Sequence, residues 1–422
     1  MNLKAFFVIV MMIFFIQCSD SATGQDGEQQ TVLSPAEMVK AITRGINVGN
    51  TLEPPLEGEW NNGPMQEYYF DDIKEAGFTV VRIPVRWDKH TDSLPPYQVD
   101  DSWMDRVEQV VDWALERQLY VILNAHHEWW LVQDFNSEKK RRFESIWNQI
   151  SERFQSKSLS LMFEVINEPK GLTQSQLDSI NADVLRIIRE KNPNRIVIIG
   201  GHEWANAEQL VTMAVPEDDF LMAYYHSYDP WTFAGEGKGL WGTLADLEAM
   251  KNRFDLVKSW SVTHATPVIL SEFGAITECD YNSRMRYYYY AVRSALEREI
   301  PFMVWDDGGM FGLYDRENRT WSEVKDILIY TFPDSPDSLY ATTTIQPAVN
   351  LSWKNGSKQY QRIFIERKSQ NENSFSTIAQ LDGNVASWQD TNVQRKQAYI
   401  YRIIAEEDTK RTFSYPLHIL VP

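Results

Sequence analysis

Two glutamates in this sequence follow directly on largely apolar runs. Glu168 comes after the run at 163–166, and Glu272 comes after the run at 268–271. A lone glutamate is usually a surface residue, but a carboxylate at the end of a buried strand is costly unless it has a partner or a use. Two such carboxylates can together hydrolyse a glycosidic bond, because one protonates the leaving oxygen while the other attacks the anomeric carbon.

Other polar side chains close apolar runs in the same way. Arg82 follows the valines at 80–81 and is expected either in a structural ion pair or as a fixed cation that keeps a nucleophilic carboxylate ionised. His126 and His127 follow the run at 121–124. Neighbours on a strand point to opposite faces, so we do not expect them to bind one metal ion together, and His126 is favoured for the pocket.

Three further residues complete this set of strand-end side chains. His226 and Tyr228 follow the run at 223–225, and Trp305 follows the run at 302–304. Trp305 is expected to form a floor beneath a sugar, with a core position as the alternative. The four tyrosines at 287–290 fall inside a helical pattern and are predicted to serve packing and the helix surface. Because no phosphate loop, HExxH motif or serine nucleophile elbow is present, neither a cofactor nor a metal ion is predicted.

These side chains need a scaffold that gathers the ends of several strands. Between residue 44 and about residue 330, apolar β-rich runs alternate with longer amphipathic stretches, as in βα units around a parallel sheet. The runs lie at 45–51, 78–87, 119–128, 161–168, 196–201, 220–228, 267–274 and 301–306. Helical patterns include 103–117, 143–154, 176–191, 244–260 and 321–330. The sequence therefore predicts an α/β fold, a (β/α)8 TIM barrel at 33–331 with its active site at the C-terminal ends of the strands.

The pattern changes after a segment rich in Pro, Ser and Asp at 332–338. Short strands with turns between them are predicted at 351–353, 360–367, 376–381 and 399–404, which indicates a small all-β sandwich. We expect a linker at 332–340 and the sandwich at 341–422. Trp353 and the stretches at 365–367 and 401–403 resemble fibronectin type III domains.

The N-terminus has the order of an export signal. Lys4 precedes an apolar run at 5–16, which is too short to span a membrane, and Cys18 lies two residues beyond the end of that run. We predict a signal at 1–18 with lipidation of Cys18, or plain cleavage nearby, and a polar tether at 19–32. The protein is thus expected outside the cytoplasm, either secreted or as a cell-surface lipoprotein. Only Cys279 would then remain, so no disulfide within the chain is predicted.

Composition narrows the class of partner. The 422 residues carry a formal net charge of -18, which would repel a phosphate backbone, so nucleic acid is not an expected partner. A neutral polysaccharide is not repelled. The 15 Trp, 19 Tyr and 20 Phe residues agree with sugar binding, because sugar rings stack on flat aromatic faces. A monomer is expected, with membrane contact only through a lipid at Cys18.

Seven motifs occur in the order found in glycoside hydrolase family 5, the cellulase family, which the region from about 35 to 330 resembles. They are GINVGNTLE at 45–53, RIPVRW at 82–87, NAHHE at 124–128, VINEP at 165–169, HSYDP at 226–230, SEFG at 271–274 and VW at 304–305. Ala125 and the loop at 233–239 depart from the family pattern, which leaves the exact substrate open.

The resemblance implies a role for each matching residue. Glu168 is similar to the acid/base, Glu272 to the nucleophile, and Asn167 to the residue that binds the sugar 2-hydroxyl. The other residues similar to substrate-binding or orienting positions are Arg82, His126, His127, His226, Tyr228, Trp305, Asn50 and Trp204.

The resemblance also implies a retaining mechanism on β-1,4-glucan. Cellulose or mixed-linkage glucan is the favoured substrate, followed by xyloglucan and then mannan. A surface protein that binds glycans without turnover is the alternative, although the presence of both glutamates argues against it. Glu168 must stay protonated until it acts, and we expect the Glu272 anion to raise the pKa of Glu168 while Arg82 keeps Glu272 charged.

Overall fold

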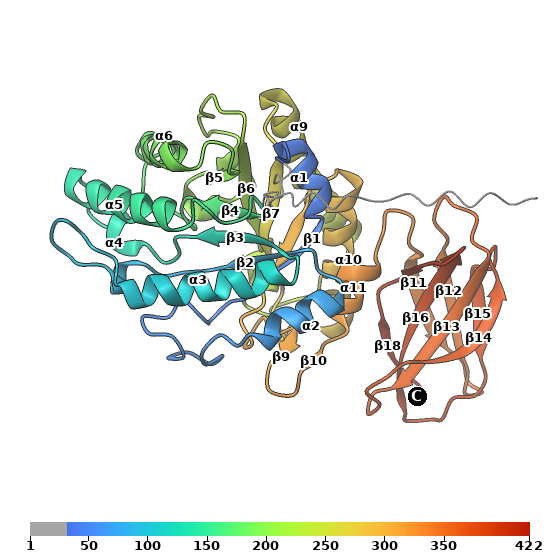
Figure 1. The fold of residues 1–422 in the computed structure, drawn as a ribbon. Coiled ribbons are helices and arrows are strands. Elements are labelled where there is room, and N and C mark those ends of the chain that lie inside the picture. Colours follow the sequence, from blue (N-terminus) through green and yellow to red (C-terminus); the bar gives the residue numbers. More distant parts are fainter. Residues whose placement is uncertain (1–31) are drawn as a thin grey trace, which may run out of the picture. The chain divides into compact units, whose positions relative to one another are not determined.

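Eight parallel strands close into a barrel in the computed structural model, which describes residues 32–422 (Figure 1). The strands are β1 (Arg44–Asn47), β2 (Val80–Ile83), β3 (Tyr120–Asn124), β4 (Leu161–Glu164), β5 (Val197–Gly200), β6 (Leu221–Ser227), β7 (Val268–Phe273) and β8 (Phe302–Val304). Each strand pairs with the next along the chain, and β8 closes the ring on β1 by pairing Met303 with Gly45. The predicted TIM barrel is confirmed.

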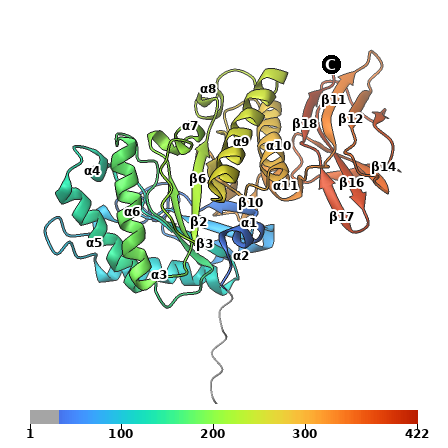
Figure 2. The same ribbon diagram turned by 90° about the horizontal axis from the view of Figure 1, so that it is seen from above.

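Helices cover the outside of the barrel, as the view from above shows for α3, α5, α6, α9 and α10 (Figure 2). The α-helices of the barrel region are α1 (Pro35–Ala41), α2 (Tyr68–Ala76), α3 (Asp101–Glu116), α4 (Trp129–Val132), α5 (Ser137–Arg153), α6 (Gln174–Lys191), α7 (Ala207–Leu210), α8 (Trp231–Ala234), α9 (Leu244–His264), α10 (Tyr281–Glu297) and α11 (Val324–Tyr330). Two 3-10 turns, η1 (Asp88–His90) and η2 (Glu203–Ala205), lie in loops after β2 and β5. Capping boxes fix where α6 and α9 begin, at Thr173 and Thr243.

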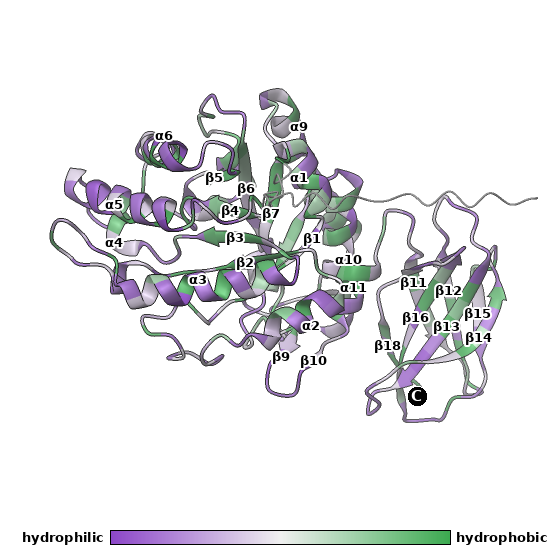
Figure 3. Ribbon diagram, in the orientation of Figure 1, coloured by the Kyte–Doolittle hydropathy of each residue, from purple (hydrophilic) through white to green (hydrophobic). Residues whose placement is uncertain are grey.

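The barrel interior changes from apolar to polar along the strands. At one level Val80, Ile122, Met162, Ile198 and Met303 form a buried cluster. Residues Met38 and Ile42 of the first helical segment pack against the same cluster. Further along the strands the interior side chains are polar and fully buried, as the asparagines and charged residues of β1 to β4 show: Asn47, Arg82, Asn124 and Glu164. Figure 3 shows the hydrophobic character of the strands beside the mainly hydrophilic α5.

Two antiparallel sheets follow the barrel, as predicted for the C-terminal region. Their strands are β11 (Asp337–Thr343), β12 (Val349–Lys354), β13 (Arg362–Ser369), β14 (Ser376–Asp382), β15 (Ser387–Asp390), β16 (Ala398–Glu407), β17 (Lys410–Phe413) and β18 (Leu417–Leu420). One sheet has the order β11-β12-β15, and the other has the order β14-β13-β16-β17 with β18 also paired to β16. The segment expected as a linker, 332–340, includes the start of β11 and the buried residues Ser335 and Leu339.

The tyrosines of α10 are packed, as their helical pattern predicts. Tyr287, Tyr288 and Tyr289 are buried. The hydroxyl of Tyr289 donates to the backbone carbonyls of Ser335 (3.3 Å) and Pro336 (2.9 Å) at the start of the C-terminal region. These side chains fill the core, and the hydroxyls of Tyr287 and Tyr288 also bond to the backbone of Ser227 and Ala275, at and just beyond the ends of β6 and β7.

No helix between residues 32 and 422 is long and apolar enough to cross a membrane. The predicted signal at 1–18, with Cys18, lies outside the described residues, and so does the tether except for Val32.

Candidate active site

Glu168 and Glu272 meet at the C-terminal ends of the barrel strands. Glu272 belongs to β7, and Glu168 lies four residues beyond the end of β4. The Glu272 side chain is 6% exposed and the Glu168 side chain is 22% exposed. One oxygen of each carboxylate and one ring nitrogen of His226 all lie within 4.8 Å of one another. The fold thus brings together two carboxylates that are far apart in the sequence, as expected.

Arg82 is fully buried and uses all five of its N–H groups. Its Nε and Nη2 donate to the two oxygens of Glu164 (2.8 and 2.5 Å), and its Nη1 donates to Oε1 of Glu272 (2.6 Å). The remaining bonds go to the side-chain oxygens of Asn47 (2.8 Å) and Asn167 (2.7 Å). Arg82 was expected either in a structural ion pair or beside a candidate nucleophile. It does both, because its guanidinium pairs with Glu164 and also binds Glu272.

Glu272 is held by a different donor on each oxygen. Arg82 binds Oε1, and the hydroxyl of Tyr228 donates to Oε2 at 2.9 Å. The pKa of Glu272 is raised, because the effect of burial exceeds that of Arg82 and the Tyr228 hydroxyl, which both stabilise the carboxylate form. These contacts fix the orientation of the carboxylate and oppose the effect of burial.

Glu168 has a histidine as its hydrogen-bond partner. Nδ1 of His226 lies 2.8 Å from Oε1 of Glu168, and Nε2 of His226 lies 3.0 Å from the hydroxyl of Ser271. Because the Ser271 hydroxyl can donate or accept, His226 can accept from a protonated Glu168 or donate to an ionised one. Glu168 also has a φ of 43°, a left-handed conformation that is rare outside glycine and concentrates at functional sites.

The pKa of Glu168 is raised to about 7. Burial is the main cause, Arg82 opposes it, and the charge of Glu164 adds to the rise. We expected the Glu272 anion to be the cause. That explanation was wrong, because loss of solvation outweighs the neighbouring charges and the contributing carboxylate is Glu164. With a pKa of about 7, a large share of Glu168 is protonated near neutral pH.

His126 and His127 differ in their surroundings. His126 is buried, and its ring lies parallel to that of Trp305 with centroids 5.9 Å apart. The ring of His127 meets that of His126 edge to face at 4.4 Å and lies between Trp60 and Trp129 at 5.6 and 5.0 Å. Our premise that both lie on a strand was wrong, because β3 ends at Asn124 and His127 has a φ of 58°.

All three histidines of the site are neutral at neutral pH. Burial lowers the pKa of His126 well below its ordinary value, and it lowers the pKa of His127 and of His226 to about 4. Their rings therefore act as hydrogen-bonding and stacking groups, and Arg82 is the cation that contacts Glu272.

Asn50 and Trp204 lie on loops at the same end of the barrel, without a direct contact to either glutamate among the described residues. The Asn50 amide donates to Oδ1 of Asn61 at 2.7 Å. Trp204 is 47% exposed and sits in η2, where residues 203–205 all have positive φ. One face of its ring is covered by Lys170, whose Nζ lies 4.6 Å from the ring centroid. Trp204 is presented to solvent, as a substrate contact requires.

Sequence reasoning missed Glu164, Asn47 and Asn124. Asn124 donates to Oε1 of Glu164 at 3.1 Å, and Asn47 donates to three backbone carbonyls of β7 and β8, which holds Arg82 in place. A signal was present for Glu164, since it is a charged residue inside the apolar run that leads to Glu168. Such a residue needs a buried cation, and Arg82 supplies it.

Comparison with known proteins agrees with this geometry. The family model "Cellulase (glycosyl hydrolase family 5)" matches residues 41–310. Endoglucanase H of Acetivibrio thermocellus is 46% identical over 297 residues, which cover 68% of this chain and 33% of that protein. Endoglucanase B of Clostridium cellulovorans is 30% identical over 322 residues, covering 68% of this chain and 73% of that protein. The chain spans only 33% and 42% of two of its curated relatives, endoglucanase H and the cellulase/esterase CelE of the same organism.

Solved structures extend the likeness beyond the barrel. A tri-modular endo-β-1,4-glucanase of subfamily 4 from Bacillus licheniformis, complexed with cellotetraose, has a TM-score of 0.75 and 30% identity, covering 91% of this chain and 79% of that chain. Endoglucanase Cel5A of Thermotoga maritima has a TM-score of 0.68 and 33% identity, covering 70% of this chain and all of that chain. From its ordered motifs, its paired glutamates and these matches, the chain belongs to glycosyl hydrolase family 5, the cellulase family.

Proposed function

We propose that this protein is a retaining endo-β-1,4-glucanase that uses Glu272 as its nucleophile and Glu168 as its acid/base. The observation that carries the proposal is the contrast between two carboxylates within 4.8 Å of each other. Glu272 is held by Arg82 and Tyr228, whereas burial raises the pKa of Glu168 to about 7. A separation of about 5 Å suits direct attack, because an inverting enzyme needs room for a water molecule between the groups.

The reaction proceeds in two displacements. In the first, a Glu272 oxygen forms a bond to the anomeric carbon while Glu168 donates its proton to the departing glycosidic oxygen. In the second, Glu168 accepts a proton from water, and the oxygen of that water replaces Glu272 at the anomeric carbon. His226 stays bonded to Glu168 in both states, since Ser271 lets its ring act as acceptor or as donor. We assign Asn167, whose side-chain oxygen accepts a hydrogen bond from Arg82, to binding of the sugar 2-hydroxyl, and Trp305 to stacking beneath the sugar ring.

The proposed substrate is a neutral β-1,4-glucan. The support comes from the relatives, since curated proteins at 46% and 30% identity are named endoglucanases and a related structure holds cellotetraose. The Thermotoga maritima enzyme has also been solved in complex with mannotriose, so mannan is the second candidate substrate.

Reducing-sugar release by the purified chain tests the proposal. We expect the highest kcat/KM on carboxymethylcellulose or mixed-linkage β-glucan, with lower values on xyloglucan and glucomannan. A clear preference for glucomannan would replace the substrate and leave the mechanism standing. No release from any of the four would refute the proposed activity.

The pH dependence should report the protonation of Glu168. We expect kcat/KM for soluble β-glucan to fall as the pH rises through about 7, because only protonated Glu168 can donate and burial raises its pKa to about 7. The measurement is a profile of kcat/KM between about pH 5 and pH 9. An aryl cellobioside with an acidic phenol is the control, since its leaving group departs without a proton and its profile should be flatter. A fall centred at or below about pH 5, where ordinary carboxyl groups titrate, would contradict the assignment.

The regions outside the barrel have proposed roles of their own. We propose that the C-terminal sheets form a fibronectin type III-like module, a proposal that the two antiparallel sheets and the buried Trp353 and Tyr401 support.

We also propose export and lipidation at Cys18, which the order of a lysine, an apolar run and a cysteine supports. Labelling cells with a fatty-acid analogue tests this, because Cys18→Ser should lose both the label and the membrane association.

A further inference from the structure

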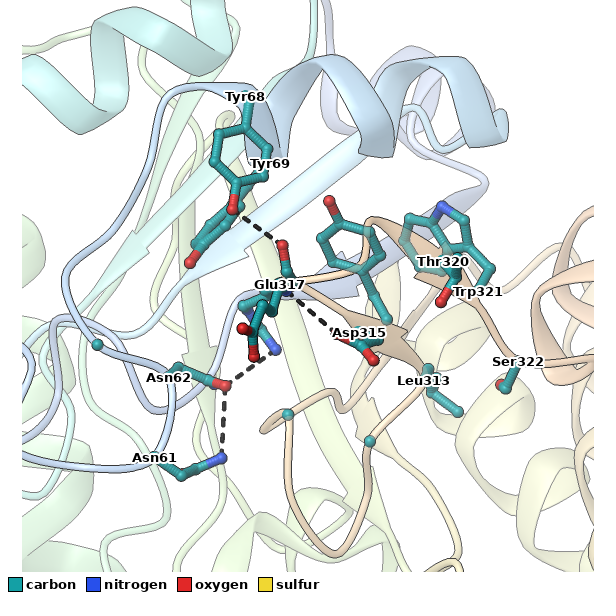
Figure 4. A pocket seen from close by; sticks show the side chains of 15 residues that line it. Asn61, Asn62, Tyr68, Tyr69, Leu313, Asp315, Glu317, Thr320, Trp321 and Ser322 are labelled. Carbon is teal, nitrogen blue, oxygen red and sulfur yellow. Dashed lines mark hydrogen bonds between the residues drawn. The ribbon is translucent and has the colours of Figure 1, made fainter.

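A cavity of about 850 Å³ lies outside the catalytic residues (Figure 4). Its walls come from the loop after β1, the first residues of α2, the loop after β8, and the hairpin of β9 (Tyr314–Asp315) and β10 (Thr320–Trp321). None of the residues proposed to bind substrate lines it. Its size falls within the range that holds small ligands.

Aromatic rings make up much of the cavity wall. Tyr68 and Tyr69 meet edge to face with centroids 4.9 Å apart, and Tyr314 and Trp321 stack at 4.5 Å. In Figure 4, Tyr68, Tyr69 and Trp321 lie in the upper part of the view, and Asn61 and Asn62 lie in the lower part. Tyr69 and Tyr314 are buried, whereas Tyr68 and Trp321 are partly exposed, and the exposed parts of these two rings offer apolar surface to the apolar face of a sugar ring.

Among the charged groups of the wall, Arg316 has an ion-pair partner, whereas Asp315 and Glu317 have none among the described residues. Arg316 is buried and pairs with Asp306 at 3.1 Å, and Asp315 accepts hydrogen bonds from the backbone and side chain of Asn318. Amides and hydroxyls supply the other polar groups of the wall, beside the carboxylates of Asp315 and Glu317. Such a lining repels an anion and offers hydrogen bonds to a neutral ligand rich in hydroxyl groups.

Two polar atoms of the wall still have no hydrogen-bond partner among residues 32–422. They are Nε of Arg316 and Oγ of Ser322, and both are buried. A buried polar atom without a partner is unfavourable. A ligand hydroxyl that approached them after a small side-chain rotation would recover part of that cost.

The cavity adjoins the loops that carry the proposed substrate contacts. The Asn62 amide donates to the carbonyls of Gly49 (2.6 Å) and Asp307 (2.7 Å), and Asn61 accepts a hydrogen bond from Asn50 (2.7 Å). Asn61 and Asn62 thus form a wall with Asn50 on one side and the cavity on the other. A polysaccharide held in the cavity would be anchored close to the catalytic glutamates.

We propose that this cavity is a second binding site for a segment of β-1,4-glucan, separate from the catalytic cleft. The proposal rests on the proposed function, because it takes the same polymer as the ligand. Binding at a second point on the same polymer raises the local concentration of substrate at the catalytic site. Its effect should therefore be confined to long chains.

Calorimetric titration with cellopentaose tests the site. The full chain carrying Glu272→Ala, which should be unable to hydrolyse the probe, is expected to bind two molecules. Adding Thr320→Arg, which places a long charged side chain in the cavity from an exposed position, should reduce this to one. Thr342→Arg is the matched control, since Thr342 is also an exposed threonine on a strand, and it should still bind two molecules.

Kinetics supply a second readout in the active chain. Thr320→Arg and Tyr68→Ala should each raise KM for β-glucan by about tenfold, while kcat/KM for an aryl cellobioside stays unchanged. Tyr340→Ala, which removes an exposed tyrosine of β11, is the matched control for Tyr68→Ala. If the Glu272→Ala chain bound only one cellopentaose molecule while the chain without this substitution hydrolysed β-glucan normally, the proposal of a second site would be refuted and the proposed function would stand. No binding together with no hydrolysis would overturn the proposed function as well.

Discussion

Replacing Glu272 by alanine should abolish hydrolysis of polysaccharide and of aryl glycosides alike. Glu272 is the carboxylate that Arg82 and Tyr228 orient, at 2.6 and 2.9 Å, and it is the proposed nucleophile. Without it the covalent intermediate cannot form, so a good leaving group gives no relief. We expect a loss larger than that caused by removing the acid.

Product stereochemistry identifies the missing group. Azide added to Glu272→Ala should give at best the α-configured glycosyl azide, because the anion would attack from the side that Glu272 has vacated. Glu138→Ala, at an exposed position in the first turn of α5, is the control and should keep full activity. Substantial turnover of an aryl cellobioside by Glu272→Ala without added azide would show that Glu272 is not the nucleophile.

Replacing Glu168 by alanine should slow hydrolysis of the polysaccharide by roughly 10²–10⁴-fold, the usual contribution of a positioned general acid. The sugar hydroxyl that leaves is a poor leaving group without a proton. An aryl glycoside with an acidic phenol departs unaided, so its first step should lose far less. The comparison requires both substrates to be measured with the same variant, by initial rates and by the burst of phenol release.

Azide should rescue Glu168→Ala and yield the β-glycosyl azide. The trapped intermediate on Glu272 has lost the base that would activate water, and a small anion needs no such help. The β configuration follows from two successive inversions. If Glu272→Ala gave the β product and Glu168→Ala gave none, the two roles would have to be exchanged.

The sequence alone was sufficient for the barrel and for the residues at its mouth. Regular alternation of apolar runs and amphipathic stretches predicted the eight strands, and polar or aromatic residues at the ends of six of the runs marked the end of the barrel that holds the site. Glu168, Glu272, Arg82, His226 and Tyr228 are indeed brought together. This works because all strands of a parallel barrel point the same way, so chain position and height in the barrel are linked.

Partnerships and conformations were less accessible to sequence reasoning. The five bonds of Arg82 depend on where β1, β2, β4 and β7 stand around the ring, and no local pattern records that arrangement. The left-handed conformations of Glu168 and Trp204 could not be foreseen either, since these residue types have no preference for them. The cause of the raised pKa of Glu168 was misjudged for a related reason, because burial depends on the surrounding loops.

The second carboxylate on Arg82 has a consequence for the charge of the site during turnover. In the resting state of the proposed mechanism, the cation of Arg82 faces the anions of Glu164 and Glu272 while Glu168 is protonated, so the cluster carries one net negative charge. In the proposed intermediate Glu272 is an ester, and Glu168 has given up its proton and holds the negative charge in its place. Arg82 is then balanced by Glu164 alone. The net charge of the cluster is therefore the same before and after the first displacement. One negative charge moves from Glu272 to Glu168, and the positive charge that develops on the sugar faces this negatively charged pocket throughout.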